Sequence, residues 1–362
     1  MKKVKICFIF LLLLFTITSA PLTVYAQPSL ENISSISESK ECGYNVCDEN
    51  GKYLFSRTDV NIDDVYIDKD YNCYKVYLVD KEYNLAYAKL TDKISMPKIK
   101  KNDVGKISNN TSNKSIGLYM THNDESYIIG DNTSSVYGAG GIHDISNQLK
   151  NELENHGIKV TLDETLHIPH DSKAYTRSKS TAEKLLDNNP DCIFDIHRDG
   201  VARSAYITNH DGKEKCQIRI VVGQSNPNKE KNLKFALYLM AVADELYPWL
   251  FTDIYYASGN YNQSMSNKML LFEMGTYLVE KNLVEKSIPA LADTINTTLY
   301  NTVIDEDGNI TINAKETSSQ QSINKALNED KNNNHVIIAT ISMVILTITV
   351  FLLGIYFVKK LN

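Results

Sequence analysis

The sequence predicts an α/β protein, with an open, mostly parallel or mixed sheet that has helices on both faces, preceded by a small β-rich domain. Two observations support this prediction. From residue 114 to residue 305, short apolar segments alternate with segments of helical periodicity. Before that region, residues 42–95 hold short alternating runs rich in Tyr and Val, separated by turn residues. That pattern is typical of antiparallel strands.

The larger region contains strand and helix patterns in regular succession. In chain order we expect a strand at 115–120, a helix at 142–153, a strand at 158–162, a helix around 182–186, strands at 192–196, 205–208 and 218–222, a helix at 233–246, a strand at 268–273 and a helix at 287–300. The first helix has one apolar face, and Gly157 follows it at a position suited to a C-cap. Pro248 stops the long helix. Strands separated by helices favour parallel neighbours.

The N-terminal segment has the layout of a signal peptide. Three lysines near the start precede the apolar run 6–14, and a small-residue site at 24–26 follows. This order of basic, apolar and small residues predicts a signal peptide over 1–26, with an uncleaved membrane anchor as the alternative. The polar, Ser-rich stretch 27–41 is then a linker to the β-rich domain.

The C-terminal segment predicts a single membrane span. Residues 336–358 are apolar and uncharged, which is long enough for about 30 Å of hydrocarbon. The tail 359–362 begins with two lysines, and the positive-inside rule places it in the cytoplasm. We therefore expect a cell-membrane protein whose catalytic domain, residues 114–305, is extracytoplasmic. The stretches 96–113 and 306–335 are polar and are predicted to be a linker and a stalk.

Composition excludes one class of partner. The net charge is −6, and no basic tract is interleaved with aromatic residues, so we expect no nucleic acid. Five cysteines follow the predicted signal peptide, an odd number that leaves at least one thiol free. A Cys42–Cys47 or a Cys47–Cys73 bridge is open from sequence alone.

Three of the predicted strands end in residues that can bind a metal or carry a proton. His122 and Glu125 follow the first strand, His197 follows the strand at 192–196, and Glu273 ends the strand at 268–273. The carboxyl ends of strands in an open α/β sheet form the usual ligand crevice. Two imidazoles and a carboxylate make a catalytic zinc site. Glu273 is then the acid/base that takes a proton from water.

Neighbouring residues suggest supporting roles. Asp195 or Asp199 could orient a ligand imidazole, and Arg198 could hold a substrate carbonyl or carboxylate. The segment His167-Ile168-Pro169-His170 is an alternative source of metal ligands, and His170 is the better candidate of its two histidines. His197-Arg198-Asp199 also matches the His-Arg-Asp of a kinase catalytic loop, but Ser204 stands where that loop needs Asn, and neither a glycine-rich phosphate loop nor Asp-Phe-Gly is present.

These motifs together resemble the stage II sporulation protein P family of cell-wall hydrolases. The segments that carry the resemblance are THNDESY (121–127), YTRS (175–178), DIHRDG (195–200), VVGQSN (221–226), NLKFA (232–236), YNQ (261–263) and LLFEMG (270–275). The β-rich stretch is similar to the family's N-terminal domain. The resemblance covers nearly the whole region between the two terminal hydrophobic segments.

The resemblance implies an amidase-like fold and a zinc-dependent N-acetylmuramoyl-L-alanine amidase that acts on peptidoglycan, with endopeptidase activity in some members. Carried over, His122, Glu125 and His197 bind Zn²⁺ and Glu273 is catalytic. Arg198, Asp199, Asp195 and Tyr127 then lie around the substrate or the ligands. Expected partners are a companion lytic transglycosylase and a membrane protein of the engulfment complex.

Two other readings stay open at this point. One is a catalytically weak wall-binding or assembly protein on the same fold, favoured by two departures from the family pattern. These are Met120, where the family often has another polar or His residue, and Thr276, where it often has a second Gly. The other is a general zinc peptidase, which differs in the bond that is cut.

Overall fold

A computed structural model of the chain describes residues 43–96, 98–102 and 113–313. The predicted signal peptide, the linker at 27–41 and the membrane span lie outside these residues. Within the described ranges, no helix is both long and apolar enough to cross a membrane. The four cysteines in these ranges are free thiols.

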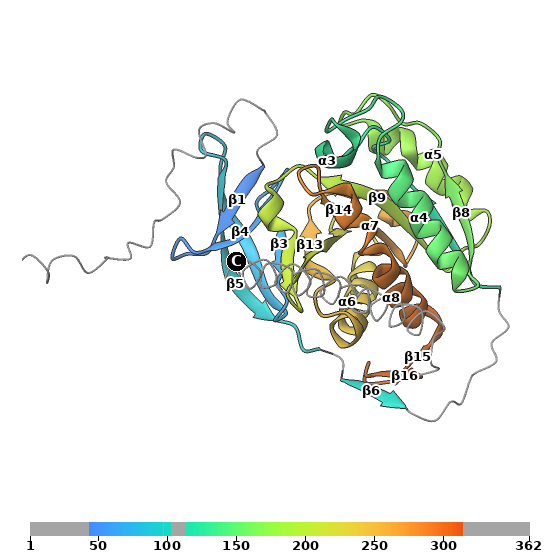
Figure 1. Cartoon of the computed structure of the whole chain (residues 1–362). Coiled ribbons are helices and arrows are strands. Elements are labelled where there is room, and N and C mark those ends of the chain that lie inside the picture. Colours follow the sequence, from blue (N-terminus) through green and yellow to red (C-terminus); the bar gives the residue numbers. More distant parts are fainter. Residues whose placement is uncertain (1–42, 97, 103–112, 314–362) are drawn as a thin grey trace, which may run out of the picture. The chain divides into compact units, whose positions relative to one another are not determined.

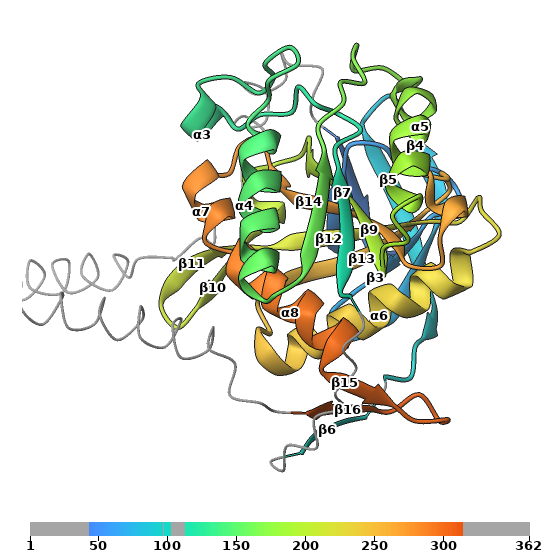
Figure 2. The ribbon, with the colours of Figure 1, turned by 90° about the vertical axis from the view of Figure 1, so that its right-hand side faces the viewer.

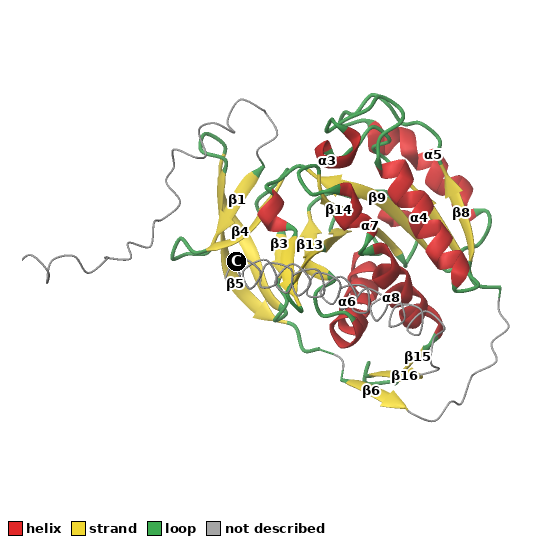
Figure 3. Ribbon diagram, in the orientation of Figure 1, coloured by secondary structure: helices red, strands yellow, loops and turns green. Residues whose placement is uncertain are grey.

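The described chain forms a mixed α/β structure (Figures 1 and 3). The strands are β1 Tyr44–Cys47, β2 Tyr53–Arg57, β3 Val65–Ile67, β4 Asn72–Asp80, β5 Leu85–Lys93, β6 Ile99–Asn102, β7 Ser115–Tyr119, β8 Lys159–Asp163, β9 Cys192–Asp199, β10 Ile207–His210, β11 Lys213–Cys216, β12 Ile218–Gly223, β13 Phe251–Ala257, β14 Met269–Thr276, β15 Thr302–Ile304 and β16 Ile310–Asn313. The helices are α3 Ile128–Asp131, α4 Ile142–Asn155, α5 Ala174–Leu186, α6 Lys229–Leu246, α7 Lys281–Glu285 and α8 Ile288–Tyr300, with 3₁₀ turns at Arg203–Ala205 and Gln263–Met265.

One mixed sheet dominates the structure and confirms the predicted α/β class. Its strand order is β2-β1-β5-β4-β3-β13-β12-β14-β9-β7-β8. The strands β14, β9, β7 and β8 pair in parallel, and β12 joins β14 in antiparallel fashion. The carboxyl ends of β7, β9 and β14 therefore lie at one edge of the sheet.

The β-rich stretch 42–95 supplies five strands to this same sheet. Strand β3 pairs in antiparallel fashion with β13, which links the N-terminal strands to the central ones. Two polar stretches also contain strands. In the predicted linker 96–113, β6 pairs with β16, and β16 begins at Ile310, within the predicted stalk 306–335.

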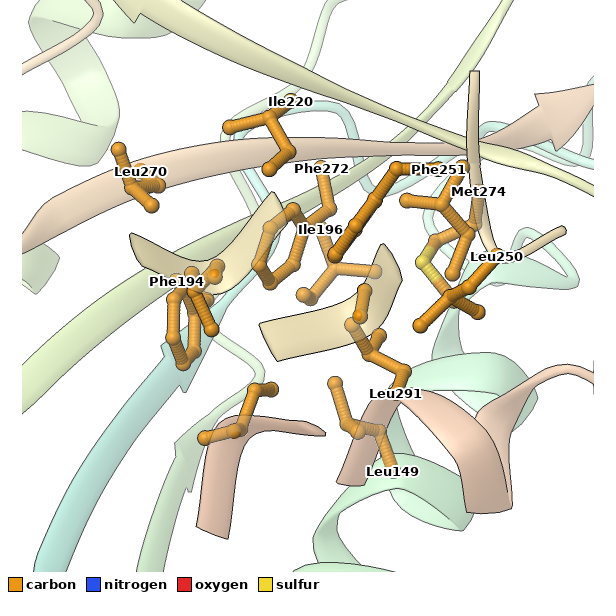
Figure 4. Packing of buried hydrophobic residues seen from close by; sticks show 14 of the residues in the cluster. Leu149, Phe194, Ile196, Ile220, Leu250, Phe251, Leu270, Phe272, Met274 and Leu291 are labelled. Carbon is orange, nitrogen blue, oxygen red and sulfur yellow. The ribbon is translucent and has the colours of Figure 1, made fainter. Parts of the chain in front are cut away.

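Strand alternation explains why polar residues occur in a buried strand. In β9, Cys192, Phe194 and Ile196 point to the face that packs against α4, α6 and α8. Figure 4 shows Phe194 and Ile196 in this core beside Leu149 and Leu291, and Figure 2 shows α4 and α8 together. The residues between them in β9 therefore point to the opposite face.

Two elements cover that opposite face. Helix α5 packs Ala182 and Leu185 against Tyr119 and Ile193. The N-terminal strands pack a second cluster, which includes Phe55, against the face of β12, β13 and β14 that bears Val221, Tyr255 and Leu271. The sheet is thus buried on both faces along β9 and β14.

Two features of the fold differ from the sequence pattern. No strand is predicted at residues 251–257, where β13 forms, and its one charged residue, Asp253, is fully buried against Arg219. The segment 205–208 was expected as a strand of the main sheet. Instead, β10 pairs with β11 in a separate hairpin whose turn residues Asp211 and Gly212 have positive φ.

Candidate functional site

The candidate site lies where β7, β9 and β14 end. His122 and Glu125 occupy a turn after β7, in which the Glu125 amide donates to the His122 carbonyl at 3.4 Å. His197 lies in β9, and its register partner in β14 is Glu273. The structure therefore brings all four predicted residues to neighbouring positions at one sheet edge.

His122, Glu125 and His197 form a compact cluster of potential ligands. One donor atom from each lies within 4.8 Å of the others. Glu125 Oε1 is 3.2 Å from His122 Nδ1 and 3.6 Å from His197 Nδ1. Tetrahedral ligands about 2.0–2.1 Å from Zn²⁺ are about 3.3 Å apart, so the two separations from Glu125 fit the ion.

Glu125 and His197 are buried, His122 is partly buried, and the charges of the three side chains interact strongly. Burial disfavours charge on Glu125, but His197 and His122 outweigh it, and the pKa of Glu125 is well below its ordinary value. Burial likewise disfavours charge on His197, but Asp195 and Glu125 raise its pKa well above the ordinary range. Burial lowers the pKa of His122. A cation is therefore favoured here, either a proton on His197 or a metal ion in its place.

Asp195 is the carboxylate beside the ligand imidazole. Its Oδ1 lies 2.9 Å from His197 Nε2, in an ion-pair contact that lacks the alignment of a hydrogen bond. The same carboxylate accepts hydrogen bonds from the Thr121 amide at 2.8 Å and from Thr121 Oγ1 at 2.6 Å. Of the two aspartates considered from sequence, Asp195 is thus the one placed to orient His197.

Asp199 belongs to a different network. Its Oδ1 accepts from Thr58 Oγ1 at 2.6 Å, and its Oδ2 accepts from Tyr206 at 2.8 Å and from Arg219 Nη1 at 3.1 Å. Arg219 also forms a two-pronged pair with Asp253, at 2.6 and 3.0 Å. The expectation that Asp199 orients an imidazole is replaced by this buried ion-pair network.

Glu273 is held by an arginine that the sequence analysis did not identify. Arg57 Nη1, from the end of β2, donates to Glu273 Oε1 and lies 3.2 Å from Asp199 Oδ2. Glu273 is only 4% exposed. Burial raises the pKa of Glu273, an effect that Asp199 reinforces and that Arg57 opposes. Glu273 is therefore a carboxyl group that holds a proton more readily than usual, as acid/base catalysis requires.

The backbone after Glu273 depends on Gly275, which has φ +72°. A Cβ at this position would lie 2.8 Å from Cys216 Sγ. We expect Gly275→Ala to lower the free energy of unfolding by about 2–3 kcal/mol, from left-handed strain plus this contact, as measured by chemical denaturation. The matched control is Gly51→Ala, because Gly51 has φ +78° and open space around it. It should cost only about 1 kcal/mol, and equal losses in the two variants would contradict the steric argument.

Arg198 and Tyr127 hold the loop after β7, which carries the predicted ligands His122 and Glu125. The Arg198 guanidinium donates to the Ser126 carbonyl at 3.2 Å and to the Ser134 carbonyl at 2.8 Å, and its amide donates to Glu125 Oε2 at 2.8 Å. Tyr127 is fully buried, and its hydroxyl donates to the Met274 carbonyl at 3.0 Å. Both residues thus lie around the predicted ligand Glu125, and contact of either with a substrate stays a prediction.

Two further residues contact the cluster. The His170 ring stacks on His122 with centroids 3.8 Å apart, and its Nδ1 is 3.0 Å from Asp124 Oδ1. Its pKa is raised by that hydrogen bond. The Tyr175 ring lies parallel to His197 at 6.1 Å. Of the rival pair considered from sequence, His170 thus lies against a predicted ligand, while His167 is buried and bonded to the Met120 carbonyl and Thr181 Oγ1.

Comparisons with known proteins agree with the motifs. A curated relative, stage II sporulation protein P of Bacillus subtilis (strain 168), is 28% identical over 191 residues, which are 48% of this chain. The chain spans about half of that relative's length, 47%.

Solved structures with a similar arrangement include the CwlD amidase of Clostridioides difficile in complex with the GerS lipoprotein. It is 17% identical, and the match covers 52% of this chain and 98% of that one, with a TM-score of 0.38. An N-acetylmuramoyl-L-alanine amidase of Clostridium difficile 630 is also 17% identical, with 52% and 95% covered and a TM-score of 0.34.

The sequence model of one family covers most of the described chain. It matches residues 55–296, a range that begins in β2 and ends in α8, and so includes Arg57, the ligand cluster and Glu273. The chain belongs to the stage II sporulation protein P family.

Proposed function

We propose that this protein is a zinc-dependent N-acetylmuramoyl-L-alanine amidase that acts on peptidoglycan during sporulation. The observation that carries the proposal is the cluster of His122, Glu125 and His197 beside a buried carboxyl group, Glu273, whose pKa is raised. Family membership supports the choice of peptidoglycan and of sporulation. The bond cut is the amide between the lactyl group of the glycan and L-alanine of the stem peptide.

The residues of this chain have separate roles in the proposed reaction. His122, Glu125 and His197 would hold the ion, with Asp195 beside His197 fixing that imidazole. Zn²⁺ supplies Lewis acidity, which polarises the scissile carbonyl and activates water. Glu273 accepts a proton from the attacking water and returns it to the leaving amine. Burial of Glu125, His197 and Glu273 limits the access of bulk water to these charges.

Location and partners are also part of the proposal. A cleavable signal peptide at 1–26 and a C-terminal span at 336–358 would place the catalytic region outside the cytoplasmic membrane. There it would reach the wall together with a lytic transglycosylase and a membrane protein of the engulfment complex.

Zinc binding is the first expected result. The full-length protein, stripped of metal, should bind one Zn²⁺ per chain in calorimetry, and His197→Ala should remove that binding. Affinity should increase as pH rises, because the raised pKa of His197 means that a proton must leave before the ion binds. His210→Ala is the control, since His210 lies in the separate hairpin β10–β11. Binding that survives His197→Ala would place the ion elsewhere.

The function itself is tested on purified wall sacculi. The full-length protein with zinc should release free stem peptides and leave peptide-free glycan, both identified by mass spectrometry. Cleavage between peptides alone would reassign the enzyme as an endopeptidase. A folded, zinc-loaded protein that binds sacculi but releases nothing would favour the wall-binding or assembly role.

A further inference from the structure

The end of β2 places a guanidinium group inside the catalytic site. Arg57 is 8% exposed, and its Nη1 contacts both Glu273 Oε1 and Asp199 Oδ2. Its guanidinium also lies 5.5 Å from the ring centre of Tyr255. Arg57 is therefore fixed by charge and by packing, although 216 positions separate it from Glu273 along the chain.

The contact with Arg57 gives the two carboxylate oxygens of Glu273 different hydrogen bonding. Oε1 accepts the hydrogen bond from Arg57, whereas Oε2 is buried and has no hydrogen-bond partner among the described residues. A carboxylate that acts as a base needs one oxygen free and correctly aimed. The hydrogen bond to Oε1 orients this oxygen toward Arg57, so Oε2 is the oxygen available to exchange the proton.

The residues on either side of Arg57 are hydrogen-bonded to the central part of the structure, which holds the Arg57 backbone in place. The Ser56 carbonyl accepts from Arg219 Nη1 at 2.8 Å. Thr58 Oγ1 donates to Asp199 Oδ1 at 2.6 Å and accepts from the Gly200 amide at 3.0 Å. Three consecutive residues thus dock on the central strands, and two of them bind the same aspartate.

We propose that Arg57 is a positioning residue for Glu273, and that the N-terminal strands are therefore part of the catalytic site rather than a separate binding module. This inference rests on the proposed function for its kinetic consequence. Its structural part, the coupling of Arg57 to Glu273, stands independently of which bond is cut.

The test compares Arg57→Met and Arg57→Lys with the wild type, all as full-length protein. We expect Arg57→Met to lower kcat for stem-peptide release by about tenfold or more, with KM and zinc affinity within about twofold of wild type. Arg57→Lys, which keeps the charge but loses the planar fork, should fall between them. Arg203→Met is the matched control, since Arg203 pairs with the surface residues Glu214 and Glu280, and its kcat should not change.

Other kinetic patterns would overturn the inference. An unchanged kcat in Arg57→Met would show that Glu273 needs no positioning by Arg57. A raised KM with unchanged kcat would make Arg57 a substrate contact. An equal loss of zinc affinity and activity would assign it a purely structural role. If Arg57→Met does not fold, Arg57→Lys decides by the same criteria.

A double-mutant cycle separates this inference from the proposed function. Unfolding equilibrium constants are measured for Arg57→Lys, Glu273→Gln and the double variant. Each variant changes the unfolding equilibrium constant by some factor. If the two residues are coupled, the product of the two single-variant factors should differ from the double-variant factor by about fivefold or more. Equality of the product and the double-variant factor would overturn the inference. A wild type that releases no peptide defeats the proposed function, yet the cycle still decides whether Arg57 and Glu273 act together.

Discussion

Glu273→Gln is expected to lower kcat for stem-peptide release by about 10²- to 10⁴-fold, the usual contribution of a general acid/base. The amide keeps the size of the side chain and can still accept from Arg57 through its oxygen, but it cannot take a proton from water. Zinc affinity should be unchanged, because Glu273 is not a member of the ligand cluster. Mass spectrometry of released fragments and calorimetry of zinc binding measure the two quantities.

The wild-type rate should also report the ionisation of Glu273. The base form is needed for attack, so the rate falls as the pH falls through the pKa of this group, which lies above its ordinary value of 4.5. This acidic limb should disappear from the residual activity of Glu273→Gln. Glu214→Gln, on the exposed face of the hairpin β10–β11, is the matched control and should behave as wild type. Full activity in Glu273→Gln would mean that another group carries the proton.

Asp199→Asn is expected to destabilise the fold by about 3 kcal/mol or more, within the range for breaking a buried ion pair. Asp199 is 2% exposed and accepts from Thr58, Tyr206 and Arg219. An asparagine of the same shape replaces one acceptor oxygen with a donor that faces a guanidinium. Urea denaturation followed by circular dichroism measures the loss.

The same residue predicts how stability responds to acid. Two arginines and two hydrogen-bonding hydroxyls overcome the effect of burial and lower the pKa of Asp199 from 3.8 to about 2. A group with a depressed folded-state pKa stabilises the fold above its unfolded value, and the contribution is lost as pH falls. For Asp199 this is about 2 kcal/mol, lost between about pH 4 and about pH 2.

The acid response distinguishes Asp199 from the other carboxylates. In Asp199→Asn the decline in stability between about pH 4 and about pH 2 should be shallower than in wild type. Asp211→Asn is a suitable control, because Asp211 is exposed at a turn with φ 52°, which asparagine also adopts. An identical acid profile in wild type and Asp199→Asn would show that the buried network does not depress this pKa.

The charge balance of this network explains why Glu273 differs from Asp199. Among the described residues, Arg57 and Arg219 face three carboxylates, those of Asp199, Asp253 and Glu273. Two positive charges cannot fully compensate three negative ones in a buried region. Asp199 contacts both arginines, whereas Glu273 contacts only Arg57, so of these two carboxylates Glu273 holds a proton more readily.

The ligand cluster could be anticipated from sequence because its placement follows from local rules. His197 comes after a run of apolar residues, and alternation puts it on the face opposite Phe194 and Ile196. Parallel pairing of β9 with β7 and β14 then aligns the ends of the three strands. Each step depends on neighbours in sequence or on a general preference of α/β sheets.

The roles of Arg57, Arg198 and Tyr127 could not be anticipated in the same way. Arg57 ends a short strand in an otherwise ordinary segment, and its partner lies in β14. Arg198 is close to the cluster, but only the path of the 121–135 loop shows that its donors are occupied by backbone carbonyls. Such contacts depend on the tertiary arrangement, for which a single sequence carries no periodic signal.

The sheet order also determines when the enzyme can become active. Pairing of β3 with β13 and of Arg57 with Glu273 closes chain loops that span most of the described residues. Closing such long loops costs entropy before the contacts repay it, so these contacts form late in folding. A nascent chain that has formed only its N-terminal strands has Arg57 without Glu273. The contact between Arg57 and Glu273 can therefore form only after β14, near the end of the described chain, has been added.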